Sequence, residues 1–171
     1  MIFIKRLSKT PYVKQFNENA CGPAVLEMIY RYYGIKNVSQ EKIYEEYREL
    51  DSHSPGNYLM TTDNIVIDAR KRGFASFWGR ADYDNIENTV KLLKVFIEKL
   101  KTPVIVCQKF SEEEPLIGHF RIVLSLDKDF IYLHDPYIGV RFQKWPIQKF
   151  FDFWKPTGLN VTGGVFIIIK K

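Results

Sequence analysis

The chain has 171 residues, of which 46% are hydrophobic and 15% aromatic, which suits one globular domain with a sizeable core. Its longest apolar runs, such as residues 165–169, are far shorter than the roughly 20 residues that cross a bilayer, so we expect no transmembrane segment. The net charge of +5 comes from 25 basic residues interleaved with 20 acidic ones. This distribution indicates a solvated basic surface and argues against a nucleic-acid partner.

The N-terminus lacks the features of a signal peptide. Its apolar stretch, residues 1–4, is very short and precedes the basic Lys5 instead of following a basic segment. We therefore expect a cytoplasmic chain that forms one domain over residues 1–171. An intracellular domain of this size needs no disulfide, so Cys21 and Cys107 are predicted to be free thiols.

The first helix is predicted to begin at Cys21. A short strand at residues 2–5 and an irregular polar segment at residues 17–19 come before it. Pro23 suits the first turn of a helix, where its missing N–H costs nothing, and apolar residues recur at helical spacing until Gly34. The cysteine is thus placed at a helix N-terminus.

Further helices and then strands follow. The helices are predicted from Ser39 to Glu49, from Thr62 or Asp63 to Gly73 and from Asn85 to Lys101, with a loop at residues 51–58. Beyond Pro103 the pattern predicts strands at residues 104–108, 120–126, 130–134 and 164–169, a tight turn at residues 128–129 and a short helix between Pro146 and Trp154. This order indicates an α+β fold in which N-terminal helices pack on an antiparallel sheet.

Cys21 is the first candidate for chemistry. The free N–H groups and partial positive charge of a helix N-terminus favour a thiolate. Taken alone, however, a cysteine is more often a buried structural residue. A thiol hydrolase also needs an imidazole, a group that orients the imidazole and donors for the oxyanion.

His119, Asp135 and Gln15 are candidates for these three roles. His119 begins a strand whose even-numbered residues fill one face, so its side chain points to the other face, toward a cleft. Asp135 ends the next strand, and the short turn between the strands predicts a hairpin that brings the two residues close. Asp135 could then orient one imidazole nitrogen and leave the other for Cys21. Gln15 lies six residues before Cys21 and could share an oxyanion with the Cys21 N–H.

These segments together resemble peptidase family C39, the papain-like bacteriocin-processing endopeptidases, and their C39-like relatives. The resemblance rests on QFNENACGPA at residues 15–24, HFRIV at residues 119–123 and DP at residues 135–136, and it extends from Pro11 to the C-terminus through the aromatic stretch at residues 150–158. It implies a papain-like fold. It also implies Cys21 as nucleophile, His119 as general base and acid, Asp135 as orienting residue and Gln15 as oxyanion donor.

Two features depart from the family's pattern. Ala20 stands where an acidic residue often precedes the cysteine, which leaves the mechanism intact. The best-known members are N-terminal domains of peptide-exporting ATP-binding transporters, whereas this sequence has no membrane helices and no G-x-x-x-x-G-K-[ST] phosphate loop. Their leader-peptide substrate is therefore not transferred to this chain, and a separately encoded peptide transporter is a candidate partner.

The sequence thus predicts a cysteine peptidase that cleaves a peptide or protein substrate through a thioester acyl-enzyme, without a cofactor. Two alternatives stay open. The thioester could be resolved by an amine or thiol, as in an acyltransferase or transpeptidase, or the domain could bind peptides without catalysis. A nucleic-acid binder would differ from all of these, because its affinity would fall steeply with salt and ignore Cys21.

The remaining candidate residues receive structural interpretations. Cys107 lies in an apolar strand and is expected in the core. His134 is expected at the surface or in a subsite, and His53 in a solvated loop. The acidic run at residues 112–114 is expected to be solvated and could border the cleft near His119. No cysteine or histidine pair has ligand spacing, so no metal site is predicted.

Overall fold

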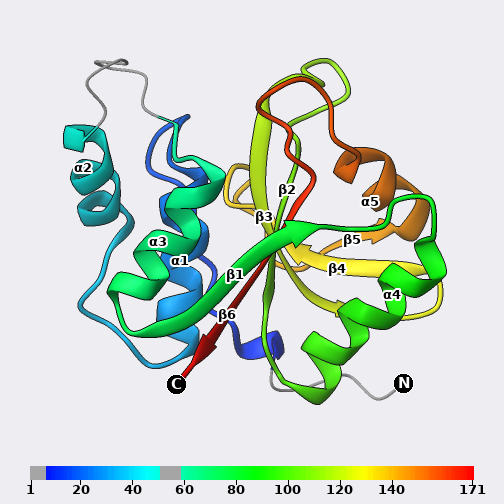
Figure 1. Cartoon of the computed structure of the whole chain (residues 1–171), viewed down its shortest axis with the longest axis horizontal. Coiled ribbons are helices and arrows are strands. Elements are labelled where there is room, and N and C mark those ends of the chain that lie inside the picture. Colours follow the sequence, from blue (N-terminus) through cyan, green and yellow to red (C-terminus); the bar gives the residue numbers. More distant parts are fainter. Residues whose placement is uncertain (1–6, 51–58) are drawn as a thin grey trace.

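The computed structural model describes residues 7–50 and 59–171. Its helices are α1 (Cys21–Tyr32), α2 (Gln40–Leu50), α3 (Thr62–Lys71), α4 (Ile86–Lys94) and α5 (Ile147–Trp154), with a 3-10 turn η1 (Leu7–Lys9) and a π-helical turn η2 (Val95–Lys99). Its strands are β1 (Phe74–Arg80), β2 (Val104–Lys109), β3 (Gly118–Leu126), β4 (Phe130–His134), β5 (Gln143–Pro146) and β6 (Gly164–Lys170). Helices cover both sides of one antiparallel sheet (Figure 1), which confirms the predicted α+β class.

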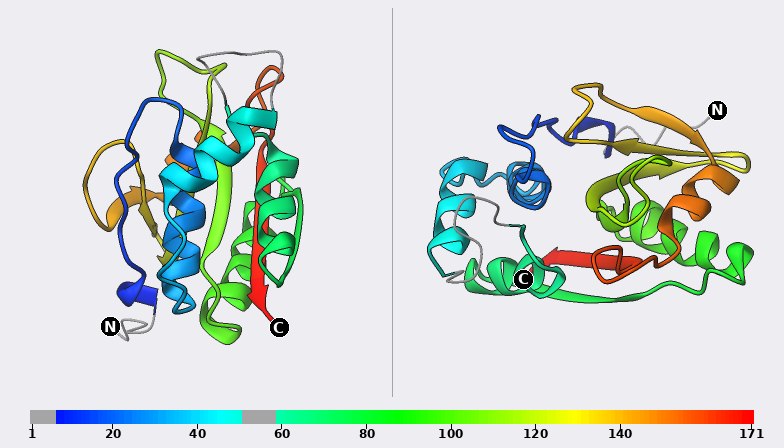
Figure 2. Two further views of the ribbon diagram at one scale, coloured as in Figure 1. Left: turned by 90° about the vertical axis from the view of Figure 1, so that its left-hand side faces the viewer. Right: turned by 90° about the horizontal axis from the view of Figure 1, so that it is seen from above.

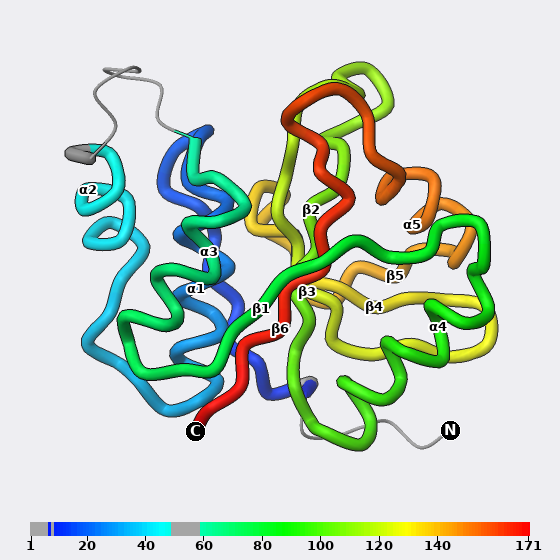
Figure 3. Tube along the Cα trace, viewed as in Figure 1, coloured from blue at the N-terminus to red at the C-terminus, as the bar shows by residue number. Residues whose placement is uncertain are grey.

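The sheet has the strand order β1-β6-β2-β3-β4-β5, and every neighbouring pair is antiparallel. The last strand in the sequence, β6, therefore lies between β1 and β2, as the trace in Figure 3 shows. This interior position explains the apolar run of β6, because Phe166, Ile167 and Ile168 are all buried.

Different helices cover the two faces of the sheet. Seen from above, α1 lies on one side of β2 and β3 and α5 on the other (Figure 2). All residues of α1 from Cys21 to Tyr30 are buried, which identifies α1 as a central helix between the sheet and the other N-terminal helices. On the opposite face, α5 buries Phe150, Phe151 and Trp154 completely.

Two edge strands were not predicted. β1 lies between α3 and α4 in the sequence, so the helices do not all precede the sheet. It pairs with β6, the last strand of the chain. β5 has four residues and pairs with β4 at the other edge. β5 is short, and β1 buries only Phe74 and Ser76 of its seven residues, so their pairing partners, more than their own patterns, make them strands.

The predicted fourth helix is interrupted near its end. Its α-helical part stops at Lys94, and η2 continues the chain with π-type hydrogen bonding, as in Leu100 N–H to the Val95 carbonyl at 3.0 Å. Lys101 then adopts a positive φ of 54° that ends the helical segment. The predicted strand at residues 2–5 and loop at residues 51–58 lie outside the described residues.

Candidate active site

Cys21 is the first residue of α1, where that helix meets β3. The N-cap residue Ala20 makes no side-chain capping bond. Its side chain therefore does not bind the backbone N–H groups of the first helical turn. Gly22 allows close approach to the next segment, because a Cβ at this position would lie 2.8 Å from Met60 Cβ. The local sequence therefore places the thiol at the junction of α1, β3 and the segment that leads into α3.

His119 and Asp135 form a buried pair at one end of the β3–β4 hairpin. The strands are antiparallel, so the start of β3 lies beside the end of β4. His119 Nε2 is 2.8 Å from Asp135 Oδ1, and the Tyr137 N–H donates to the same oxygen at 2.9 Å. Because Asp135 accepts at Nε2, the Nδ1 atom of the imidazole is left for Cys21.

The second oxygen of Asp135 binds Arg121, a residue to which the sequence pattern assigned no role. Arg121 Nε donates to Asp135 Oδ2 at 2.7 Å, and the side chain is only 2% exposed. Residues i and i+2 of a strand share a face, so an arginine two positions after His119 in an apolar strand was the available signal. Asp135 thus joins an imidazole on one side to a guanidinium on the other.

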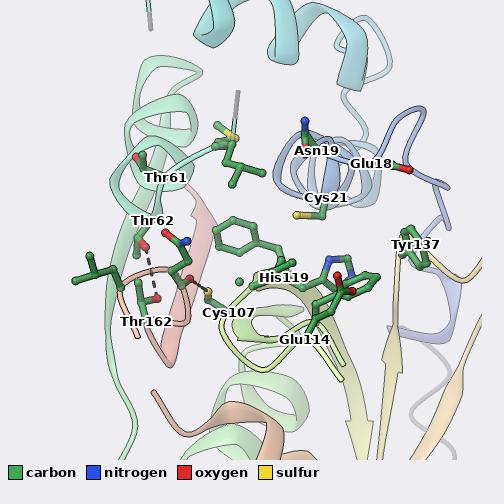
Figure 4. Close-up of a pocket in the computed structure, with 18 residues that line it drawn as sticks. Glu18, Asn19, Cys21, Thr61, Thr62, Cys107, Glu114, His119, Tyr137 and Thr162 are labelled. Atoms are coloured by element: carbon green, nitrogen blue, oxygen red, sulfur yellow. Dashed lines mark hydrogen bonds between the residues drawn. The ribbon is translucent and has the colours of Figure 1, made fainter. Parts of the chain in front are cut away.

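Cys21 and His119 face one cavity of about 490 Å³. Figure 4 shows their side chains entering it from α1 and from β3, with Cys21 Sγ turned away from the imidazole in this view. Glu114 and Cys107 also line the cavity. The acidic run at residues 112–114 therefore ends at the cavity, and Cys107, although buried as predicted, contributes to its wall.

The titratable groups of the site are strongly affected by burial. Burial raises the pKa of the Cys21 thiol to about 11, although the N–H groups of Phe120 and Gly22 favour the thiolate. Burial and the charge of Arg121 lower the pKa of His119 against the opposing effect of Asp135. Burial thus favours a neutral thiol and a neutral imidazole, and it opposes the thiolate that the helix N-terminus favours.

The carboxyl group of Asp135 behaves in the opposite way. Burial alone would raise its pKa, but the hydrogen bond with His119 and the charges of His119 and Arg121 hold the pKa well below its usual range. Asp135 is therefore ionised whenever the protein is folded near neutral pH.

Gln15 is held by the segment before α1. Its Nε2 donates to the carbonyls of Asn17 at 2.8 Å and Glu18 at 3.1 Å, and its buried Oε1 has no partner among the described residues. Its backbone N–H donates to the Pro136 carbonyl at 3.0 Å, which ties this segment to the residue after Asp135. Gln15 is not among the described residues that line the cavity.

The prediction that His134 is a surface or subsite residue is wrong. Its side chain is 1% exposed, with Nε2 at 3.2 Å from the Thr10 carbonyl and Nδ1 accepting the Phe142 N–H at 3.1 Å. Both nitrogens thus contact backbone groups, one in the segment before α1 and one in the segment between β4 and β5. His53 lies outside the described residues.

Metal-binding clusters and membrane-spanning helices are both absent from the described residues, 7–50 and 59–171. No group of three histidine, cysteine or acidic side chains in these ranges could hold a metal ion. Within the same ranges, no helix combines the length and apolar character needed to cross a membrane.

Comparison with known proteins gives a family and several similar structures. The family described as "Peptidase_C39 like family" matches residues 7–160. No curated protein matches the chain.

Three solved structures share the fold. The peptidase domain of Streptococcus ComA, described as a bi-functional ABC transporter of a quorum-sensing pathway, aligns with a TM-score of 0.68 at 22% identity, covering 94% of this chain and 100% of that one. A protein described as a C39-like peptidase from Bacillus anthracis aligns at 0.71 and 16%, covering 96% of each chain. A double glycine motif protease from an AMS/PCAT transporter, solved with its leader peptide, aligns at 0.59 and 23%, covering 96% of this chain and 94% of that one.

Proposed function

The chain belongs to the Peptidase_C39 like family, and from this premise we propose that residues 1–171 act as one cysteine-peptidase domain that cleaves an amide bond of a peptide or protein. One observation carries the proposal: Cys21 and His119 line the same cavity, and His119 Nε2 lies 2.8 Å from Asp135 Oδ1. This arrangement supports a nucleophile, a base and an orienting group in one site.

The proposed reaction begins from the neutral thiol and imidazole. Cys21 transfers its proton to His119 Nδ1 as Sγ bonds to the carbonyl carbon, and N–H groups at the start of α1 stabilise the oxyanion. The C–N bond then breaks, His119 returns the proton to the leaving amine, and a thioester forms. Water then attacks the thioester carbonyl carbon and gives a proton to His119. The C–S bond breaks to release the carboxylic acid, and His119 returns the proton to Sγ, which restores the thiol. In every step Asp135 accepts a hydrogen bond from His119 Nε2–H. This bond keeps the neutral imidazole in the tautomer that leaves Nδ1 able to accept a proton.

Gln15 is proposed as a second oxyanion donor. In the resting protein its amide donates to the carbonyls of Asn17 and Glu18. The proposal therefore requires that segment to release the amide when a substrate binds.

The test is cleavage of a peptide library, read by mass spectrometry, by the wild type and matched cysteine variants. Cys107 is the control for Cys21, because both thiols are buried and line the same cavity. We expect Cys107→Ser to retain cleavage and both Cys21→Ser and His119→Ala to lose it by at least about 1,000-fold. Cleavage that survives in Cys21→Ser would contradict the proposal. Added hydroxylamine would reveal resolution of the thioester by an amine.

A peptide-binding module is the second candidate, and the raised pKa of Cys21 favours it. It predicts peptide affinity that is equal in the wild type and in Cys21→Ser, without cleavage. Titration of both proteins with library peptides separates the two candidates.

Two relatives in the comparison are parts of transporters, so a separately encoded peptide transporter is a candidate partner of this chain. Co-purification with transporters encoded in the same genome tests this. The cytoplasmic location expected from the sequence stays a prediction.

A further inference from the structure

Each of the three side-chain nitrogens of Arg121 has a hydrogen-bond partner in the interior of the protein. Its side chain is 2% exposed, and Nε donates to Asp135 Oδ2 at 2.7 Å. Nη1 donates to the Lys109 carbonyl at 3.0 Å and Nη2 to the Phe110 carbonyl at 2.8 Å. The guanidinium also lies over the Trp145 ring, 4.9 Å from its centroid. A buried charge is costly unless it is paired and hydrogen-bonded, so this set of contacts fixes the guanidinium in one place.

The groups that Arg121 holds are groups that contact the imidazole of His119. Asp135 binds Nε2, and the Phe110 ring meets the imidazole edge to face, with centroids 5.3 Å apart at 84°. We propose that Arg121 is a positioning residue of the site, whose guanidinium holds the Asp135 carboxylate and the Phe110 backbone so that both fix the orientation of His119. The proposal rests on the proposed function, because it concerns the residue proposed there as the base.

Arg121 also affects the proton affinity of His119. A carboxylate paired only with the imidazole would stabilise the imidazolium, but here the guanidinium binds the other oxygen of the same carboxylate. The charge of Arg121, next to burial, lowers the pKa of His119. The titratable groups that face His119 or its cavity are Arg121 on its own strand, Cys21, Cys107, Asp135, Tyr137, Glu18 and Glu114. A neutral imidazole can accept the thiol proton, so the guanidinium keeps His119 competent as a base.

The test follows the imidazole directly by NMR of the full chain with ¹⁵N-labelled histidine. In the wild type we expect the Nε2–H tautomer of His119 and a pKa below about 6.5. In Arg121→Gln we expect the pKa to rise by about one pH unit, because the opposing positive charge is gone. His134 is the internal reference, since its partners are backbone groups of Thr10 and Phe142 and its signals should not move. An unchanged His119 titration in folded Arg121→Gln would overturn the proposal.

Arg72→Gln is the control for loss of an ion pair to a buried carboxylate, although Arg72 itself is 20% exposed. Arg72 directly follows α3, and its Nε lies 2.9 Å from Oδ2 of Asp68 on that helix. The Asp68 side chain is fully buried. We expect this variant to lose stability and to leave the titration of His119 unchanged. A similar shift of the His119 pKa in both variants would also overturn the proposal, because it would show that a general loss of stability causes the shift.

Arg121→Lys decides the question if Arg121→Gln does not fold. Lysine keeps the charge but cannot reproduce the three-way fork, so we expect the pKa of His119 to stay near the wild-type value while its Nε2–H exchanges with solvent at least about tenfold faster. Wild-type exchange would overturn the positioning role. None of these measurements requires catalytic activity. A failed cleavage assay therefore contradicts only the proposed function, whereas an unchanged titration and exchange of His119 contradict only this inference.

Discussion

At the scale of single residues, Asp135 connects the parts of the site. Its two oxygens bind different partners, His119 and Arg121, and all three side chains are at most 3% exposed. The carboxylate therefore offsets a buried positive charge and orients the imidazole at the same time. Removing it should affect both stability and the site.

Asp135→Asn should lower the free energy of unfolding by about 3–5 kcal/mol, because it keeps the shape of the side chain but leaves Arg121 as a buried charge without a carboxylate. Urea denaturation measures this change. Asp152→Asn, an exposed carboxylate on α5, is the control and should change stability by less than about 0.5 kcal/mol. Equal effects of the two substitutions would contradict the assigned ion pair.

The resting thiol gives a second prediction at this scale. With the pKa of Cys21 raised to about 11 by burial, alkylation by iodoacetamide at pH 7.5 should be roughly 100-fold slower than for a free thiol. Peptide mass spectrometry between pH 6 and 10 measures the rate, with the urea-unfolded chain as the reference. An acidic limb below pH 7 that disappears in His119→Ala would instead indicate a preformed thiolate–imidazolium pair.

At the scale of elements, the start of β3 is fixed by the segment between α5 and β6. A Cβ at Gly118 would lie 2.0 Å from the Asn160 carbonyl oxygen, and the same oxygen lies 3.6 Å from Cys107 Sγ. The Thr157 hydroxyl donates to the Pro115 carbonyl at 2.6 Å and so joins this segment to the one before β3. These contacts form the wall of the cavity next to His119.

Gly118→Ala should lower the free energy of unfolding by about 1–3 kcal/mol, because the added methyl group forces the two segments apart. The cleavage rate should fall with it, since the start of β3 carries His119. Gly79→Ala on β1 is the matched control, because a Cβ there meets no atom within 4 Å. Thermal denaturation compares the stability of the two variants. An unchanged stability of Gly118→Ala would show that the segments around Gly118 can move apart to accommodate the methyl group.

At the scale of the whole molecule, burial of ionisable groups determines how stability depends on pH. The pKa values of His119 and His134 are lowered mainly by burial, and that of Asp135 by its partners. The folded state therefore binds these protons less tightly than the unfolded chain does. Their contribution to stability is present above the unfolded pKa values, about 6.5 for histidine and 3.9 for aspartate, and is lost as the pH falls below them.

The urea midpoint should therefore be constant from pH 8 to pH 7 and fall as the pH is lowered from about 6.5 to 4. Chemical denaturation at fixed ionic strength measures it, and an unchanged m-value shows that the unfolded state is the same at each pH. A midpoint that is flat down to pH 4 would mean that the two histidines have the same pKa in the folded and unfolded states, which would contradict the lowered pKa values.

The sequence by itself determined the features that depend on nearby residues. Pro23 and Gly34 bracket α1 and place Cys21 at its start, and the short turn between β3 and β4 brings His119 beside Asp135. Local conformational preferences and period-two alternation are sufficient for these elements, because their hydrogen bonds close over a few residues.

Only the tertiary structure decided the features that depend on distant segments. β1 becomes a strand by pairing with β6, about 90 residues later. Arg121 finds its partners at the end of β2, just after β4 and on β5. The pKa of Cys21 follows the same rule: a helix N-terminus favours the thiolate, but burial under β3 raises the pKa to about 11. The physical reason is that desolvation depends on which segments enclose a group, and a linear pattern does not contain that information.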